Sequence, residues 1–250
     1  MDSLIPWIGG KKLLRDAIIA RFPSGKIGRY IEVFGGAAWI LFRCERHADM
    51  EVYNDYDGNL VNLFRCAKYH PAELDRELSL LLNSREMFYD FLDWQSCRGT
   101  TDIQRAARFF MLVRCSYGAD RRSFSCTPKN VIAARSHIDD ISKRLARVVI
   151  ENKDFCALIK SYDRSESLFF CDPPYVGTET YYGGFTTDDH VRLKDVLSGI
   201  KGKFILTYND DPFIRNLYEG YKFDLVERNH NLRARYAAKS RYREIIITNY

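Results

Sequence analysis

Short β-rich runs alternate with longer amphipathic segments along this chain, and this alternation leaves few possible folds. Seven runs of apolar, β-branched and aromatic residues are bounded by turn residues, and each has the length of one strand. They are residues 29–34, 50–54, 148–151, 168–171, 203–208, 222–228 and 242–249. Because strands separated by amphipathic helices are typical of a parallel sheet covered by helices, we predict an α/β fold with a seven-stranded sheet.

The long stretch between the second and third runs is predicted to be almost entirely helical. Apolar residues recur at helical spacing in residues 71–84, 85–96 and 102–117. Pro71 suits a first helical turn, and Gly99 with Thr100 and Thr101 suits a break followed by an N-cap. We therefore predict two domains, which are a catalytic domain of residues 1–62 and 145–250 and an inserted helical domain of residues 63–144.

Composition and charge limit the class of protein. No apolar run approaches the roughly 20 residues that span a bilayer, and the N-terminus lacks the pattern of a signal peptide, so we expect a cytoplasmic protein with no membrane contact. The seven cysteines form no CxxC pair and the five histidines stand apart, so we expect reduced thiols and no metal site. The net charge of +5 favours a polyanionic partner.

The first two β-rich runs are followed by residues suited to a nucleoside-containing cofactor. After the first run come Gly35 and Gly36, and we expect a helix from Ala37. This turn is not GxGxxG, which disfavours a dinucleotide. Asp55 follows the glycine turn at about the 20-residue distance from which an acid can accept hydrogen bonds from ribose hydroxyls. The alternative role for this acid is a helix N-cap, which Asp57 could supply instead.

The fourth β-rich run leads directly into the tetrapeptide DPPY, Asp172 to Tyr175. Asp172 is expected at the carboxyl end of a central strand, where sheets of this kind carry their chemistry. The two prolines have a fixed φ and no N–H, so the turn is stiff and presents one carboxylate and one backbone carbonyl. Two adjacent acceptors match a planar amino group, and Tyr175 can stack on the ring that bears it. The alternative is a rigid turn that only ends a strand.

Together these segments resemble the Dam-type, D12 class DNA adenine-N6 methyltransferases, which use S-adenosylmethionine. The resemblance begins at PWIGGKK (6–12), where we expect a helix from Lys11, and ends at REIIITNY (243–250). Between them lie YIEVFGG, YND, NKDF, DPPY and LTYND. The resemblance implies the Rossmann-like methyltransferase sheet, with the helical insertion as the target-recognition domain.

The resemblance also implies a role for individual residues. The cofactor-binding residues are Trp7, Lys11, Phe34, Gly35, Asp55, Asp154, Phe155 and Asp172. The catalytic residues are Asp172, Pro173 and Tyr175. The carboxylate of Asp172 and the carbonyl of Pro173 would accept hydrogen bonds from N6 of a flipped-out adenine, and Tyr175 would stack on the base. Methyl transfer to N6 would then be direct.

DNA contacts are expected on two basic segments, the insertion with its loop at 118–130 and residues 228–243. The loop is predicted to be exposed or to form a short hairpin. The residues predicted to bind DNA are Arg114, Arg121, Arg122, Lys129, Arg233 and Arg235. Family members that recognise GATC carry a hairpin rich in Asn and Gly, whereas this loop has two arginines, so we predict relaxed or shortened specificity. We expect a monomer, and a cognate restriction endonuclease is a further partner to test.

Three alternatives stay open at this point. The substrate could be another planar amine, in RNA adenine, cytosine N4 or a glutamine side chain, although the cytosine and glutamine families usually have Ser or Asn in place of Asp172. The chain could be an inactive DNA-binding protein of the same fold. The presence of four residues argues against this alternative: Lys11, Asp55, Asp172 and Tyr175. A nicotinamide-dependent oxidoreductase is disfavoured because GxGxxG is missing.

Overall fold

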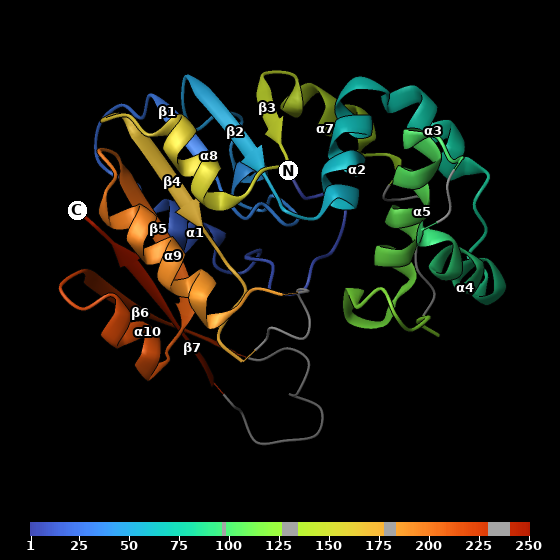
Figure 1. The fold of residues 1–250 in the computed structure, drawn as a ribbon. Coiled ribbons are helices and arrows are strands. Elements are labelled where there is room, and N and C mark those ends of the chain that lie inside the picture. The colour runs from blue at the N-terminus through green and yellow to red at the C-terminus, as the bar shows by residue number, and fades with distance from the viewer. Residues whose placement is uncertain (97–98, 127–134, 178–183, 230–240) are drawn as a thin grey trace. The chain divides into compact units, whose positions relative to one another are not determined.

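The computed structural model describes residues 1–96, 99–126, 135–177, 184–229 and 241–250 (Figure 1). In this part of the chain seven strands form one mixed sheet in the order β3-β2-β1-β4-β5-β7-β6, which confirms the predicted fold class. The strands are β1 (Arg29–Glu32), β2 (Met50–Asn54), β3 (Val148–Glu151), β4 (Ser167–Cys171), β5 (Lys203–Asn209), β6 (Lys222–Asn229) and β7 (Arg241–Thr248). All seven predicted strands are present: β2 and β3 have the predicted bounds, and the ends of the other five differ from the prediction by one or two residues.

The helices follow the predicted periodicity. They are α1 (Arg15–Ile19), α2 (Gly58–Tyr69), α3 (Pro71–Ser79), α4 (Arg85–Asp93), α5 (Asp102–Cys115), α7 (Ile138–Leu145), α8 (Phe155–Tyr162), α9 (Thr187–Ser198) and α10 (Pro212–Leu217). Pro71 begins α3, and Thr101 caps α5 in a reciprocal capping box with Gln104, as predicted. Among the described residues, no helix combines the length and apolar character that crossing a membrane would require.

Two compact units make up the described chain. The first consists of Met1–Arg15 and Gly35–Asn152. Within it β2 and β3 pair in parallel, and α5 packs against α2, α3 and α4. Buried Phe88 of α4 packs with Met111 and Leu112 of α5 in a hydrophobic cluster. The helices of residues 63–144 thus bury apolar faces against one another, and their separation as an inserted domain stays a prediction.

A buried ion pair joins three segments of the first unit. The guanidinium of Arg144 in α7 binds both carboxylate oxygens of Glu51 in β2, at 2.7 and 2.8 Å, and both side chains are only 5% exposed. The same guanidinium donates to the carbonyl oxygens of Leu41 and Cys44, at 2.8 and 2.9 Å. Arg144 therefore ties α7 and β2 to the segment that follows the glycine turn.

The second unit consists of Asp16–Phe34 and Lys153–Tyr250. Strands β1, β4 and β5 are parallel, and β7 pairs antiparallel with both β5 and β6. Helices α8 and α9 contact each other and lie side by side over the sheet (Figure 1). All five residues of β4 are buried, as expected of a central strand. Because β1, β4 and β5 run in the same direction, Phe34 and Asp172 follow strands that end at one edge of this sheet.

Two predicted helix starts are wrong. The chain does not enter a helix at Ala37, because Gly36 and Ala38 adopt left-handed φ values of +48° and +55°, which interrupt a right-handed helix. A short 3-10 helix, Leu41–Arg43, follows instead. Lys11 lies in a turn in which its Nζ donates to the carbonyl of Gly9 at 2.9 Å, and α1 begins later in the chain.

Candidate active site

Asp55 lies immediately after β2 in the first unit and is held by two backbone donors. Its Oδ2 accepts from the N–H of Gly36 and its Oδ1 from the N–H of Asp57, both at 2.8 Å. Asp57 supplies the N-cap of α2, accepting from the N–H groups of Asn59 and Leu60. The N-cap alternative therefore applies to Asp57, and Asp55 is available for a ligand.

The chemistry of Asp55 fits a vicinal diol. Each carboxylate oxygen has two lone pairs, so an oxygen that accepts one backbone hydrogen bond can accept another from a hydroxyl. Burial raises the pKa of Asp55 to about 6, against a weaker lowering by its two backbone hydrogen bonds. The two hydroxyls of a ribose match the two oxygens.

The glycine turn beside Asp55 has no room for side chains. A Cβ on Gly35 would lie 2.2 Å from Cε2 of Tyr53 and 2.8 Å from the carbonyl oxygen of Asn54. A Cβ on Gly36 would lie 2.8 Å from Cδ1 of Trp7, and the hydroxyl of Tyr53 donates to the carbonyl of Gly36 at 2.8 Å. Trp7, Gly35 and Asp55, three predicted cofactor residues, thus belong to one packed cluster in the first unit. Lys11, a fourth, is 4% exposed in the same unit.

The predicted DNA-binding arginines of the first unit differ in their surroundings. Arg121 forms an ion pair with Asp57 at 2.6 Å. Arg114 donates to the carbonyl of Leu4 at 3.2 Å, and burial lowers its pKa. Arg122 is exposed. Lys129, Arg233 and Arg235, the other three, lie outside the described residues.

Asp172 follows β4 in the second unit and is oriented by the neighbouring strand. Thr207 in β5 is fully buried, and its Oγ1 donates to Oδ1 of Asp172 at 2.7 Å. Pro173 after it is buried. The carboxylate is therefore fixed both by a proline turn and by a buried hydroxyl. Thr207 was not predicted as a site residue, although a hydroxyl residue in the otherwise apolar run FILTY was a usable signal.

Tyr175 is anchored through its hydroxyl. The Oη donates to Oε2 of Glu244 in β7 at 2.9 Å, and the ring lies 5.8 Å from that of Tyr208. Glu244 is 1% exposed. Burial, together with the charges of Asp172 and Glu244, raises the pKa of Tyr175 well above its ordinary value, so the phenol stays protonated. Glu244 was also missed, and an acid at the start of the apolar run EIIIT was the signal for it.

Three phenylalanines of the second unit form an aromatic cluster. The rings of Phe34 and Phe155 lie 5.6 Å apart, and Phe185 lies 5.8 Å from each of them. Asp154 caps α8 through Oδ1, while its Oδ2 pairs with Arg192 at 3.1 Å. Of the predicted cofactor residues, Phe34 and Phe155 are thus in contact, and the carboxylate of Asp154 is already engaged by the cap and the ion pair.

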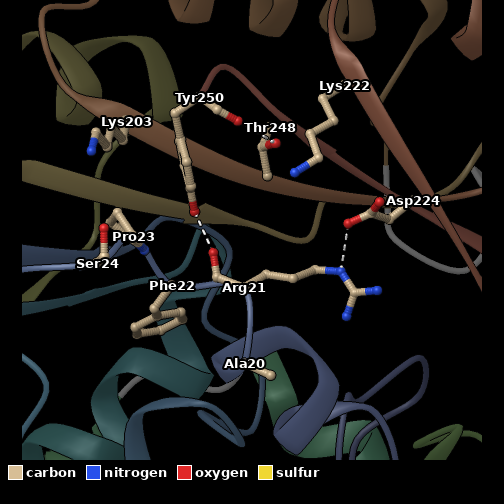
Figure 2. A pocket seen from close by; sticks show the side chains of 10 residues that line it. All are labelled: Ala20, Arg21, Phe22, Pro23, Ser24, Lys203, Lys222, Asp224, Thr248 and Tyr250. Carbon is tan, nitrogen blue, oxygen red and sulfur yellow. Dashed lines mark hydrogen bonds and ion pairs between the residues drawn. The ribbon is translucent and has the colours of Figure 1, made fainter.

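A cavity of about 300 Å³ in the second unit is lined by a different set of residues (Figure 2). They include Arg21, which pairs with Asp224 at 2.8 Å, and Lys203 and Lys222. These lysines begin β5 and β6, whereas Asp172 follows the end of β4, which runs parallel to β5. None of the predicted site residues lines this cavity.

Comparison with known proteins identifies the family of this chain. Residues 7–233 match the family described as D12 class N6 adenine-specific DNA methyltransferase. The type II methyltransferase M1.LlaDCHI of Lactococcus lactis subsp. cremoris is 28% identical, over 98% of this chain and 94% of that protein. The type II methyltransferase M.CviBI of Paramecium bursaria Chlorella virus NC1A is 26% identical over the whole of both chains. A DNA adenine methylase of Vibrio cholerae is 24% identical over 98% of this chain and 94% of that protein. This chain belongs to the D12 class of N6 adenine-specific DNA methyltransferases.

Proposed function

We propose that this adenine methyltransferase uses S-adenosylmethionine and that Asp172, Pro173 and Tyr175 receive the target adenine. The observation that carries the proposal is the fixed carboxylate at the end of β4, held by the buried hydroxyl of Thr207 at 2.7 Å. S-adenosylmethionine supplies an electrophilic methyl group on a sulfonium sulfur. The residues of this chain provide binding, orientation and acceptors for the amine.

The cofactor roles follow from the chemistry of the residues. Asp55 accepts hydrogen bonds from the ribose hydroxyls, for which its two oxygens retain acceptor capacity. The aromatic faces of Phe34 and Phe155 suit an adenine ring, which stacks on aromatic side chains. Trp7, Gly35 and Lys11 of the first unit and Asp154 of the second are the other residues that we propose for cofactor binding.

Asp172 and Pro173 act on the exocyclic amine. The N6 lone pair is delocalised into the adenine ring, which makes the amine a poor nucleophile. Two acceptors, the carboxylate of Asp172 and the carbonyl of Pro173, hold the two N–H bonds so that the lone pair is free to react. Both acceptors also stabilise the positive charge that develops on the nitrogen. Tyr175, whose hydroxyl is anchored to Glu244, stacks on the base after it leaves the duplex.

DNA is held by basic side chains. Arg122 is exposed and suits a phosphate contact, as do Arg114, Lys129, Arg233 and Arg235 by their charge. Arginine also reads guanine edges, and a loop with Arg121 and Arg122 supports relaxed or shortened specificity. The remaining expectations are a monomeric enzyme and a cognate endonuclease as partner.

Substitution of Asp172 tests the proposal. We expect Asp172→Ala to lower the rate of methyl transfer by at least about 10²-fold, the size of effect seen when one preorganised electrostatic group is removed. The measurement is single-turnover transfer of labelled methyl groups to duplex DNA, followed by mass spectrometry of the nucleosides. N6-methyladenine is the expected product, whereas N4-methylcytosine or activity on RNA alone would favour the alternative amines.

The matched control is Asp195→Ala, which removes an exposed carboxylate from α9. Both variants should melt cooperatively, and the control should keep the wild-type rate. Wild-type turnover by Asp172→Ala would refute the assignment of the catalytic residue. Mapping N6-methyladenine in treated plasmid DNA tests specificity, and one strict motif of four or more bases would reject relaxed recognition.

A further inference from the structure

Arg121 lies in a short loop whose backbone is held in a conformation that is uncommon for its residues. The loop closes with an antiparallel bridge between Ser116 and Phe124, and we call it the 116–124 loop. Gly118, Ala119 and Arg121 have φ values of +59°, +65° and +58°. Residues other than glycine rarely adopt this conformation, and it persists only where surrounding contacts hold it. The carboxylate of Asp120 accepts from the N–H groups of Arg122 and Ser123, and the Arg121 side chain adds contacts outside the loop.

The guanidinium of Arg121 is surrounded by an acid and two aromatic rings. Its Nη1 donates to Oδ2 of Asp57 at 2.6 Å. Its Cζ lies 5.2 Å from the ring centroid of Trp7 and 5.5 Å from that of Phe109. The side chains of Arg121 and Asp57 are only 31% and 27% exposed. A site made of one carboxylate and two aromatic rings suits the planar guanidinium of arginine, which can pair and stack at once. The ammonium group of lysine is not planar and does not fit such a site in the same way.

The residues that donate hydrogen bonds to Asp55 are connected to Arg121 on both sides. On one side, the N–H of Asp57 donates to Oδ1 of Asp55, and Asp57 pairs with Arg121. On the other side, the N–H of Gly36 donates to Oδ2, and Gly36 packs directly on Trp7, over which Arg121 lies. Both residues whose N–H groups hold the Asp55 carboxylate are thus connected to the guanidinium of Arg121, Asp57 directly and Gly36 through Trp7.

We propose that Arg121 is a positioning residue of the cofactor site, which holds Asp57 and Trp7 in the arrangement that presents Asp55 to the ribose. The inference rests on the proposed function, because it takes Asp55 as the ribose-binding acid. It gives Arg121 a role different from the phosphate contact predicted from its basic neighbourhood.

The test measures cofactor affinity in the absence of DNA, with S-adenosylhomocysteine as the calorimetric probe. We expect Arg121→Met to weaken its binding about 5- to 20-fold, within the range typical of coupling between sites. Asp57→Asn should cause a similar loss, since asparagine keeps the N-cap but removes the charge. The double variant should lose no more than either single variant, because both break the same contact.

Arg122→Met is the matched control, because it removes the same charge from the adjacent position. It should leave S-adenosylhomocysteine affinity unchanged and lower the slope of log affinity for DNA against log salt concentration by about one, as loss of a phosphate contact does. Arg121→Met should leave that slope unchanged. If Arg121→Met instead lowers the slope and binds S-adenosylhomocysteine normally, Arg121 is a phosphate contact and the inference is wrong.

Two further variants cover two other outcomes: failure of Arg121→Met to fold, and failure of Asp55 to bind the ribose. If Arg121→Met does not fold, Arg121→Lys decides, because it keeps the charge that faces Asp57 but not the planar group. We expect Arg121→Lys to weaken S-adenosylhomocysteine binding, and wild-type affinity would overturn the inference. Asp55→Ala tests the premise. If Asp55→Ala binds S-adenosylhomocysteine with wild-type affinity, the proposed role of Asp55 is wrong. If Asp55→Ala loses affinity but the Arg121 variants do not, only the proposed role of Arg121 is wrong.

Discussion

At the scale of single residues, the proposed contact between Asp55 and the ribose predicts that cofactor binding depends on pH. Its pKa is raised by burial to about 6, so the carboxyl takes up a proton as the pH falls through that value. The proton occupies a lone pair that the ribose hydroxyls need. Binding of S-adenosylhomocysteine should therefore be constant above about pH 7 and should weaken by nearly tenfold for each pH unit well below 6.

Calorimetry between pH 5 and 8 would measure this dependence, with proton uptake or release read from buffers of different ionisation enthalpy. Below pH 6 the binding of each cofactor molecule should release close to one proton. An affinity that stays level over the whole range would show that Asp55 does not bind the ribose in its charged form.

Thr207 provides a second prediction at this scale. Thr207→Val keeps the shape of the side chain but removes the hydroxyl that donates to Asp172. We expect a 10- to 100-fold lower rate of methyl transfer, by analogy with the effect of losing the hydrogen-bond partner that orients a metal ligand (about 10–100-fold). Thr207→Ser, which retains the donor, should recover most of the rate in single-turnover assays. Equal rates for the Val and Ser variants would contradict an orienting role.

At the scale of elements, the buried ion pair between α7 and β2 should be costly to break by removing one partner. Arg144→Met leaves Glu51 as a buried charge without its guanidinium partner, and the expected loss is about 3–5 kcal/mol in the free energy of unfolding. Urea denaturation followed by circular dichroism would measure it. In the variant Arg144→Met/Glu51→Leu both charges are absent, so it should recover most of the loss, and failure to recover would mean that the contacts of Arg144 with Leu41 and Cys44 dominate.

The helices and strands that were predicted correctly are those marked by residues within or next to the element itself. Each strand has β-rich residues and turn residues within a short window, and Thr101 and Pro71 mark helix starts by their own chemistry. The expected helix at Ala37 failed because the left-handed turn at Gly36 depends on packing against Trp7 and Tyr53, which are distant in sequence. No window of neighbouring residues contains that information.

The same reasoning explains what was predicted of the site. Asp55 and Asp172 were predicted as site residues because each follows a strand, and the end of a strand can be read from the sequence. The partners of the site residues were not predicted, because Asp57 and Arg121, or Tyr175 and Glu244, are separated by more than sixty residues and meet only through the fold. Charge alone suggested that Arg121 faces DNA, whereas its guanidinium lies against Asp57 and Trp7.

At the scale of the whole molecule, two features of the chain agree with its family. The match extends over residues 7–233, so it includes both the residues around Asp55 and those around Asp172. The sheet has three parallel strands in the second unit followed by an antiparallel pair, in which β7 lies between β5 and β6.

The position of β7 has a consequence for protein synthesis. Because β7 follows β5 and β6 in the chain but lies between them in the sheet, the growing polypeptide leaves the edge of β5 unpaired until the ribosome has released the final strand. Glu244, which anchors Tyr175, arrives with that strand. A nascent chain halted before β7 therefore carries DPPY without the hydrogen bond that anchors Tyr175.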